Sequence, residues 1–83
     1  MNNCRICGYY DGQAPWGEDG KTPTFEICPC CGVEHGFDDC DYEAVATYRK
    51  KWIGEGASWS MPRLKPDNWN LDEQLKDAPK EFS

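Results

Sequence analysis

The sequence predicts a small α+β domain that is stabilised by a bound metal ion. A short motif, C-x-x-C-G, occurs twice, at residues 4–8 and 28–32, and all six cysteines lie before residue 41. The second half of the chain has no cysteine and shows helical periodicity instead. In a chain of 83 residues the hydrophobic core supplies only about 3–5 kcal/mol of net stability, so a further stabilising element, such as a bound metal ion or disulfide bonds, is expected. We therefore expect one domain, residues 1–83, with a metal-binding ribbon (4–40), a helix (41–54), and a strap with a short C-terminal helix packed on it (55–79).

Four of the cysteines have the spacing of a tetrahedral metal site. Each motif turns the backbone so that its two sulfurs point the same way, and the glycine after the second cysteine tolerates the positive φ of that turn. The two motifs share their spacing and this glycine, which favours the ligand set Cys4, Cys7, Cys28 and Cys31. Four thiolates around one ion are typical of structural zinc, with no position left for a substrate. We predict one structural Zn²⁺ at these residues.

Short antiparallel strands are expected beside the two motifs. Residues 22–27 alternate polar and apolar side chains at their end, as a strand that leads into the second motif would. Residues 9–10 and 33–37 are the strands expected after the two motifs, and residues 14–20 are dense in turn formers and form a loop. Two metal-bearing turns, or zinc knuckles, joined to short antiparallel strands make a zinc ribbon.

The main predicted helix covers residues 41–54. Aspartates near its start are N-cap candidates, basic residues at 49–51 lie near its negative end, and Gly54 offers a C-terminal stop. The apolar positions recur in steps of three and four, the spacing of one helix face: Tyr42, Val45, Tyr48 or Arg49, and Trp52.

Beyond this helix we expect an extended strap, because its prolines exclude a longer helix. We expect its apolar side chains to lie across the core: Trp59, Met61 and Leu64, with Trp69 as a further anchor. Asn70 and the acidic Glu73, three residues later, form a capping box that opens a short helix, and Pro79 ends it. The last four residues are expected to fray.

The remaining cysteines and the single histidine leave alternatives. Adjacent side chains leave the backbone on opposing sides, so Cys30 and Cys31 are not expected to bind one ion together. Cys30 and Cys40 are then packing residues or free thiols. His35 could replace one thiolate in a Cys₃His site. The motif at 28–31 also fits a thioredoxin-type redox pair, but that use needs a strand-helix context and leaves the first motif unexplained.

Charge and composition exclude several classes of function. The formal net charge is −6, and only residues 49–51 form a basic cluster, so binding to nucleic acid is not expected. No apolar run approaches the about 20 residues of a membrane span, and no signal-peptide pattern is visible, so a reducing cytoplasm is expected. No catalytic constellation is present. We expect a non-enzymatic module that contacts another protein, with Trp16, in the turn-rich loop, as the candidate partner-binding residue.

The motifs and their flanking residues resemble known families. Cys-x-x-Cys-Gly-Tyr at 4–9 and Cys-Pro-x-Cys-Gly-Val at 28–33 resemble the two metal loops of rubredoxins and rubredoxin-like zinc ribbons. Residues 25–32 and 37–39 resemble the small bacterial cysteine-rich proteins that are named for their C-P-C-C motif. This resemblance covers the cysteine-containing half of the chain and implies a rubredoxin-like metal site in a bacterial protein.

The resemblance to rubredoxins also implies an alternative function, an iron site in an electron carrier. The acidic surface and the four-cysteine set are compatible with it. The second half of the chain adds a helix and a strap that a minimal electron carrier does not need, so zinc is preferred over iron.

Overall fold

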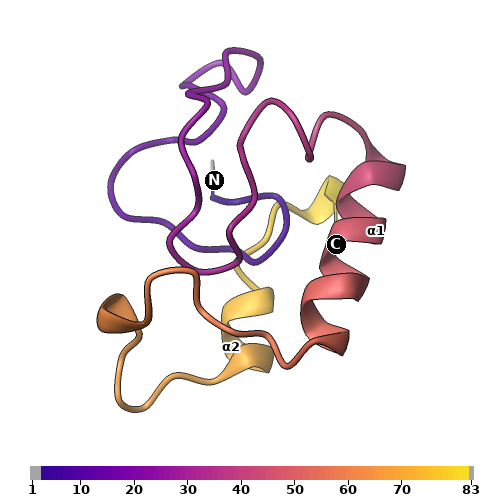
Figure 1. Ribbon diagram of the computed structural model, residues 1–83. Helices are drawn as coiled ribbons and strands as arrows, with labels where there is room; N and C mark the ends of the chain where they lie inside the picture. Colours follow the sequence, from indigo (N-terminus) through magenta and orange to yellow (C-terminus); the bar gives the residue numbers. More distant parts are fainter. Residues whose placement is uncertain (1–2, 83) are drawn as a thin grey trace.

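Two α-helices and two single 3₁₀ turns make up the regular secondary structure. The computed structural model describes residues 3–82, and its elements follow the order α1 (Tyr42–Gly54), η1 (Pro62–Leu64), α2 (Leu71–Leu75) and η2 (Lys80–Phe82). The chain before α1 forms loops and turns that lie beside that helix (Figure 1). All six cysteines therefore lie outside the helices.

The expected antiparallel strands do not form within residues 3–82, so the zinc-ribbon fold predicted from the sequence is wrong. The segments 9–10, 22–27 and 33–37 contain one isolated antiparallel bridge, between Ile27 and Glu34, and no strand. What the sequence presents as a ribbon is a set of turns.

Tight turns and a strained residue prevent a longer ladder. Phe25 has a φ of 61°, in the left-handed region, which interrupts the extended run that the alternation predicts. Pro23, two residues earlier, has no N–H to donate to a ladder. The carbonyl of Tyr9 accepts a hydrogen bond from the N–H of Cys4 at 2.9 Å, so it closes its own turn instead of pairing with another strand.

α1 lies within the predicted range because its first turn is well capped. The side chain of Asp41 accepts a hydrogen bond from the N–H of Ala44 at 2.7 Å. After the helix, Gly56 adopts a φ of 102°, which turns the chain away. Val45 and Trp52 are buried, and both belong to the predicted core face.

The strap and α2 follow the predicted pattern in part. The side chain of Asn70 accepts a hydrogen bond from the N–H of Glu73 at 3.0 Å and begins α2. Trp59 is buried in the core, but the prediction is wrong for Met61 and Leu64, which are 46% and 48% exposed. The strap also contains η1, a 3₁₀ turn that the sequence analysis missed. Proline fits the first position of such a turn, because an N–H at that position has no partner within the turn.

The C-terminal turn η2 packs on the rest of the molecule. The ring of Phe82 lies 4.9 Å from the ring of Tyr42 and 4.3 Å from the guanidinium carbon of Arg5. The frayed end expected from the sequence is therefore wrong for residues 80–82, because Phe82 gains two ring contacts there. Ser83 lies outside the described residues.

Cysteines form a large part of the core. Of the twelve buried hydrophobic residues in the described chain, proline and glycine not counted, five are cysteines. The other seven are Ile6, Val33, Val45, Trp52, Ala57, Trp59 and Ala78. Whatever holds the sulfurs in place therefore also holds the centre of the core.

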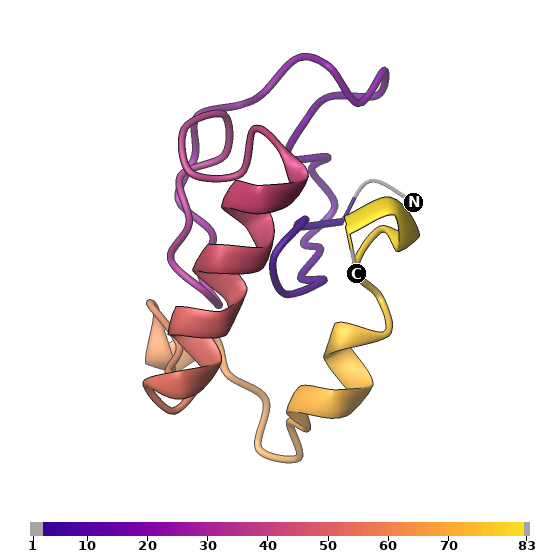
Figure 2. The same cartoon turned by 90° about the vertical axis from the view of Figure 1, so that its right-hand side faces the viewer.

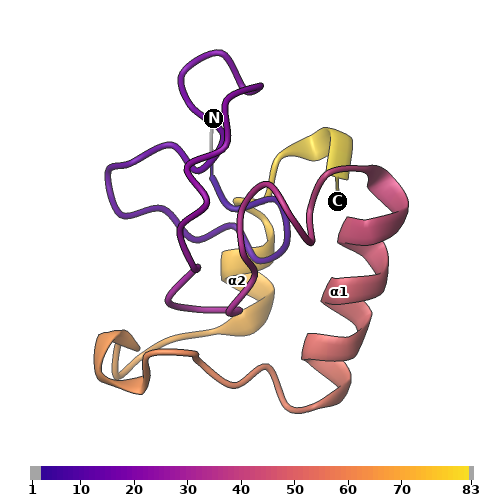
Figure 3. The ribbon, with the colours of Figure 1, turned by 45° about the horizontal axis from the view of Figure 1, so that its top comes forward.

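The first C-x-x-C-G motif lies between the two α-helices, with α1 on one side and α2 on the other (Figure 2). The turn-rich loop around residues 14–22 projects from the body of the molecule (Figure 3). In the described part of the chain, no helix is long and apolar enough to cross a membrane.

Candidate metal centre

Each C-x-x-C-G motif folds into the same tight turn. We call residues 4–9 the first cysteine loop and residues 28–33 the second cysteine loop. In each loop the glycine N–H donates to the carbonyl of the first cysteine, and the N–H of that cysteine donates to the carbonyl of the residue after the glycine. All four hydrogen bonds are 2.9 Å long. Gly8 and Gly32 have φ values of 86° and 80°, which a side chain would disfavour. The sequence repeat is therefore a structural repeat.

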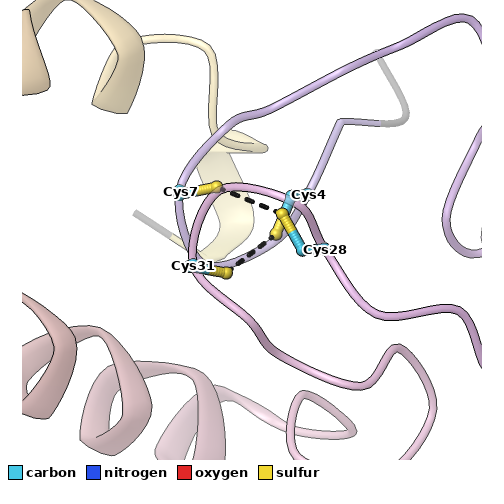
Figure 4. A group of neighbouring side chains, drawn as sticks. All are labelled: Cys4, Cys7, Cys28 and Cys31. Carbon is cyan, nitrogen blue, oxygen red and sulfur yellow. Dashed lines mark hydrogen bonds between the residues drawn. The ribbon is translucent and has the colours of Figure 1, made fainter. Parts of the chain in front are cut away.

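The two cysteine loops meet so that four sulfurs converge in the core (Figure 4). The Sγ atom of Cys4 lies 3.7 Å from that of Cys31, and the Sγ atom of Cys7 lies 3.7 Å from that of Cys28. All four sulfurs lie within 4.8 Å of one another, and all four residues are buried. The structure therefore brings together the four residues that the sequence predicts as ligands, and they could hold a metal ion.

The separation of the sulfurs fits tetrahedral coordination. A Zn–S bond of about 2.3 Å corresponds to a sulfur–sulfur edge of about 3.8 Å in a regular tetrahedron, and the Cys4–Cys31 and Cys7–Cys28 contacts measure 3.7 Å. Four thiolates complete the coordination of such an ion and leave no open position. Zinc and iron both accept soft thiolate ligands, so the geometry selects the kind of site and not the element.

The four thiols do not ionise independently in this buried group. Burial raises the pKa of the Cys7 thiol well above its ordinary value. The hydrogen bond between Cys28 and Cys31 lowers the pKa of Cys28 far below its ordinary value and raises that of Cys31. One thiolate is thus favoured at the expense of its neighbours. A divalent cation supplies the charge that allows all four to ionise together.

Two cysteines lie outside this group. Cys30 is fully buried, and its Sγ atom accepts a hydrogen bond from the side-chain amide of Gln74 at 3.1 Å. Cys40 is exposed, and its Sγ atom donates to the carbonyl of Gly36 at 3.2 Å. Neither sulfur belongs to the converging set, as the matching of the two motifs predicts.

His35 lies beside the sulfur group and not within it. Its Nδ1 atom is 3.1 Å from Oδ2 of Asp39, and both residues are buried. Burial alone would lower the pKa of His35, but hydrogen bonds to Asp39 and Cys28 outweigh burial and raise that pKa to about 10. Burial alone would raise the pKa of Asp39, yet the hydrogen bond from His35 keeps it below its ordinary value. Four cysteines complete the set, so the described residues do not favour the Cys₃His alternative.

Trp16 makes two contacts within the molecule. Its indole N–H donates to Oδ2 of Asp39 at 3.0 Å. Its ring covers the guanidinium of Arg5 at 3.7 Å, which leaves Trp16 half-buried. These contacts tie the turn-rich loop to the first cysteine loop. They do not test the partner-binding role of Trp16, which stays a prediction.

α1 holds both cysteine loops through side chains that the sequence analysis did not assign to the site. Arg49 donates through Nε and Nη2 to two carbonyls of the first cysteine loop, at 2.7 and 2.6 Å. The hydroxyl of Tyr48 donates to the carbonyl of Cys31 at 3.1 Å. The sequence analysis placed residues 49–51 near the negative end of this helix and offered Arg49 only as an alternative to Tyr48 on the core face. Helical spacing contained the signal, because position 49 lies four residues after Val45 and three before Trp52.

Two proteins of Bacillus subtilis (strain 168) are similar to the chain. YozI is 35% identical over an alignment of 92 residues, which covers 92% of this chain and 76% of the relative. YoaQ is 34% identical over 89 residues, which covers 89% of this chain and 75% of the relative. Both relatives are described as uncharacterised proteins. The similarity therefore extends well beyond the cysteine-containing half.

No family model matches the chain, and no solved structure matches it. The resemblance to rubredoxins thus gains no support from these comparisons. What remains of the prediction is the four-cysteine group that could bind a metal ion.

Proposed function

We propose that this chain, which belongs to the family of the Bacillus subtilis proteins YozI and YoaQ, is a small non-enzymatic protein with one structural zinc ion and acts by binding another protein. The observation that carries this proposal is the convergence of four buried sulfurs from two identical turns. The zinc ligands in this proposal are Cys4, Cys7, Cys28 and Cys31.

Closed coordination is the reason to propose a structural role over a catalytic one. A catalytic zinc keeps one position open for water or substrate, and a set of four thiolates fills all positions. The same sulfurs make up a large part of the core. Zinc has no redox chemistry and suits an ion whose role is to hold that core together.

The cytoplasm is the compartment we propose, because all six cysteines are free of disulfide bonds. Reducing conditions preserve thiols, both as metal ligands and as the buried Cys30.

Exposed aromatic side chains support the proposal of a protein partner. Phe37 is 72% exposed and Phe25 is 61% exposed. Phe37 lines a shallow groove of about 550 Å³ together with residues of α1, Tyr48 among them. Apolar rings that remain in water favour contact with another surface. The carboxylates beside them disfavour nucleic acid.

The first experiment identifies the metal. The full chain is produced in medium that contains both zinc and iron, purified without chelators, and analysed for bound metal and by visible spectroscopy. We expect one zinc per chain and a colourless protein. One iron per chain, with a red colour in the oxidised state and reversible reduction, would replace this proposal by an electron carrier.

The second experiment tests for a partner. The zinc-loaded chain is used to capture proteins from the cytoplasm, beside the variant Phe37→Ser and the control Leu64→Ser. Leu64 is 48% exposed and lies in η1, on the far side of the molecule from α1 (Figure 1). We expect a protein retained by the wild type and the control and lost with Phe37→Ser. Capture that all three proteins share equally would contradict a partner site at this groove. Trp16→Ala is less suitable, because it also breaks the contact with Asp39.

A further inference from the structure

The side chain of Gln74 joins α2 to the first cysteine loop by hydrogen bonds, beside Leu71 and Leu75, which pack on the core. Its Nε2 atom lies 3.2 Å from the carbonyl oxygen of Cys7 and 3.1 Å from Sγ of Cys30. Its Oε1 atom accepts a hydrogen bond from the indole N–H of Trp69 at 2.7 Å. Both ends of the amide are therefore engaged, and Trp69 orients it. One neutral group thus contacts the backbone of a candidate ligand and the sulfur of the fifth buried cysteine.

The backbone of α2 also fits closely against the first cysteine loop. A Cβ atom at Gly8 would lie 2.4 Å from the carbonyl oxygen of Gln74 and 2.8 Å from the nitrogen of Ala78. In the second cysteine loop a Cβ at Gly32 would have no neighbour nearer than 3.5 Å. The close fit therefore belongs to the first loop, where the backbone of α2 rests directly on the turn that carries Cys7.

α2 depends for its stability on its contacts with the rest of the molecule, this one among them. It has 5 residues and no buried one, and an isolated helix of this length does not persist in water. The turn on which it rests depends in turn on its sulfurs being held. Docking of α2 and occupation of the sulfur site therefore favour each other, since two events that stabilise the same turn are thermodynamically coupled.

We infer that Gln74 is a positioning residue that couples metal binding at the four-cysteine site to the docking of α2. In the metal-loaded chain, Gln74 holds the carbonyl of Cys7 and covers the sulfur of Cys30. In the metal-free chain, which we expect to unfold, the turn and α2 come apart together, and Cys30 and Trp69 become accessible. Loading of the site is thereby transmitted to the C-terminal half of the molecule. This inference rests on the proposed metal site.

The experiment compares the full chain with Gln74→Met, which keeps the length of the side chain and removes its hydrogen bonds. Glu73→Gln is the matched control on the same helix, because the Glu73 side chain is 71% exposed and pairs with the equally exposed Lys76. Zinc affinity is measured by competition with a chelator. Alkylation of Cys30 by iodoacetamide is followed by mass spectrometry at several concentrations of free zinc.

We expect Gln74→Met to bind zinc at least tenfold more weakly, the loss that is typical when an outer contact of a metal ligand is removed. Alkylation of Cys30 should be at least tenfold faster in this variant and should slow again as zinc is added. The control should match the wild type within twofold. A purely structural role for Gln74 would give fast alkylation at every zinc concentration.

Zinc affinity and Cys30 alkylation in Gln74→Met that equal those of the wild type would overturn the inference. If this variant does not fold, Trp69→Phe replaces it, because that change removes the N–H that orients Gln74 and keeps an aromatic ring toward Trp59. Wild-type behaviour of Trp69→Phe in both measurements would then overturn the inference. A wild-type chain that binds no metal would refute the proposed function itself, which is a distinguishable result.

Discussion

Removal of the metal should unfold the chain, and the size of the effect follows from the structure. The perturbations are a strong chelator, or the single substitution Cys7→Ser. The four-cysteine site joins two loops that are separated by about 20 residues, and closing such a segment costs about 2.7 kcal/mol by the chain-entropy relation. Bound structural zinc contributes an apparent 10–16 kcal/mol, roughly, in small zinc domains. The zinc contribution therefore exceeds the closure cost several-fold.

The net stability of a chain this long is smaller than or similar to the zinc contribution. At about 0.05–0.15 kcal/mol per residue, an 83-residue chain has roughly 4–12 kcal/mol. Five of the twelve buried hydrophobic residues, proline and glycine not counted, are cysteines, so little core remains once the sulfurs are released. Loss of the metal thus removes about all of the net stability.

Amide NMR spectra and circular dichroism, recorded during titration with free zinc, measure this effect. We expect dispersed amide signals only with metal bound, and a collapsed spectrum for Cys7→Ser. Cys40→Ser is the control, because Cys40 is exposed and lies outside the sulfur group; it should keep the wild-type spectrum. A dispersed, native spectrum after complete removal of metal would refute the reasoning.

Three further predictions concern the surroundings of the site. Gly8→Ala should reduce the free energy of unfolding of the zinc-loaded chain more than Gly32→Ala. Both substitutions cost about 1–2 kcal/mol, because alanine disfavours the left-handed backbone conformation. At Gly8 the new Cβ atom also overlaps the backbone of α2, which adds about 1–3 kcal/mol. Equal losses in the free energy of unfolding of the two variants, measured by urea denaturation, would contradict this prediction. The pKa of His35, the single histidine, is raised to about 10, so its ring should stay protonated at pH 8 in an NMR titration. The ion pair of His35 with Asp39 should contribute fully to the free energy of unfolding below about pH 6.5, and this contribution should disappear as the pH rises toward 10. A His35 ring that titrates near pH 6.5 would show that the ion pair is absent. Arg49→Lys should lower the free energy of unfolding by about 1.5–3 kcal/mol, because lysine cannot serve both carbonyls. The exposed neighbour Lys50→Ala should change it by less than about 0.5 kcal/mol.

Local patterns predicted the helices and the sulfur group, and they failed for the sheet. The capping residues Asp41 and Asn70 act through their own side chains on the next turn, so sequence contains all that their helices need to begin. The alternation of residues 22–27 was read as a strand, yet a strand exists only if a partner pairs with it. Phe25, with its positive φ, breaks the extended run, and one bridge remains. No periodicity in the sequence contains that information.

The outer contacts of the site could be predicted only in part. Arg49 lies at a core-facing position of a recognisable helix, so its role could be found from spacing. Gln74 is separated from Cys7 by 67 residues of sequence, and its contact exists only because α2 folds back onto the first cysteine loop. Long-range contacts of this kind depend on how segments pack, which a single sequence does not encode in any local pattern.

The sequence by itself predicted the two cysteine turns, since the glycine after each C-x-x-C pair tolerates the positive φ that the turn requires. It also showed that the two pairs are equivalent, which favoured these four sulfurs over a set that contains His35. Only the tertiary structure decided that the turns meet without a sheet, that α1 and α2 flank the first of them, and that Cys30 is buried beside the site and not in it. The physical reason is range: a turn is closed by hydrogen bonds within six residues, whereas the packing around it depends on side chains from both halves of the chain.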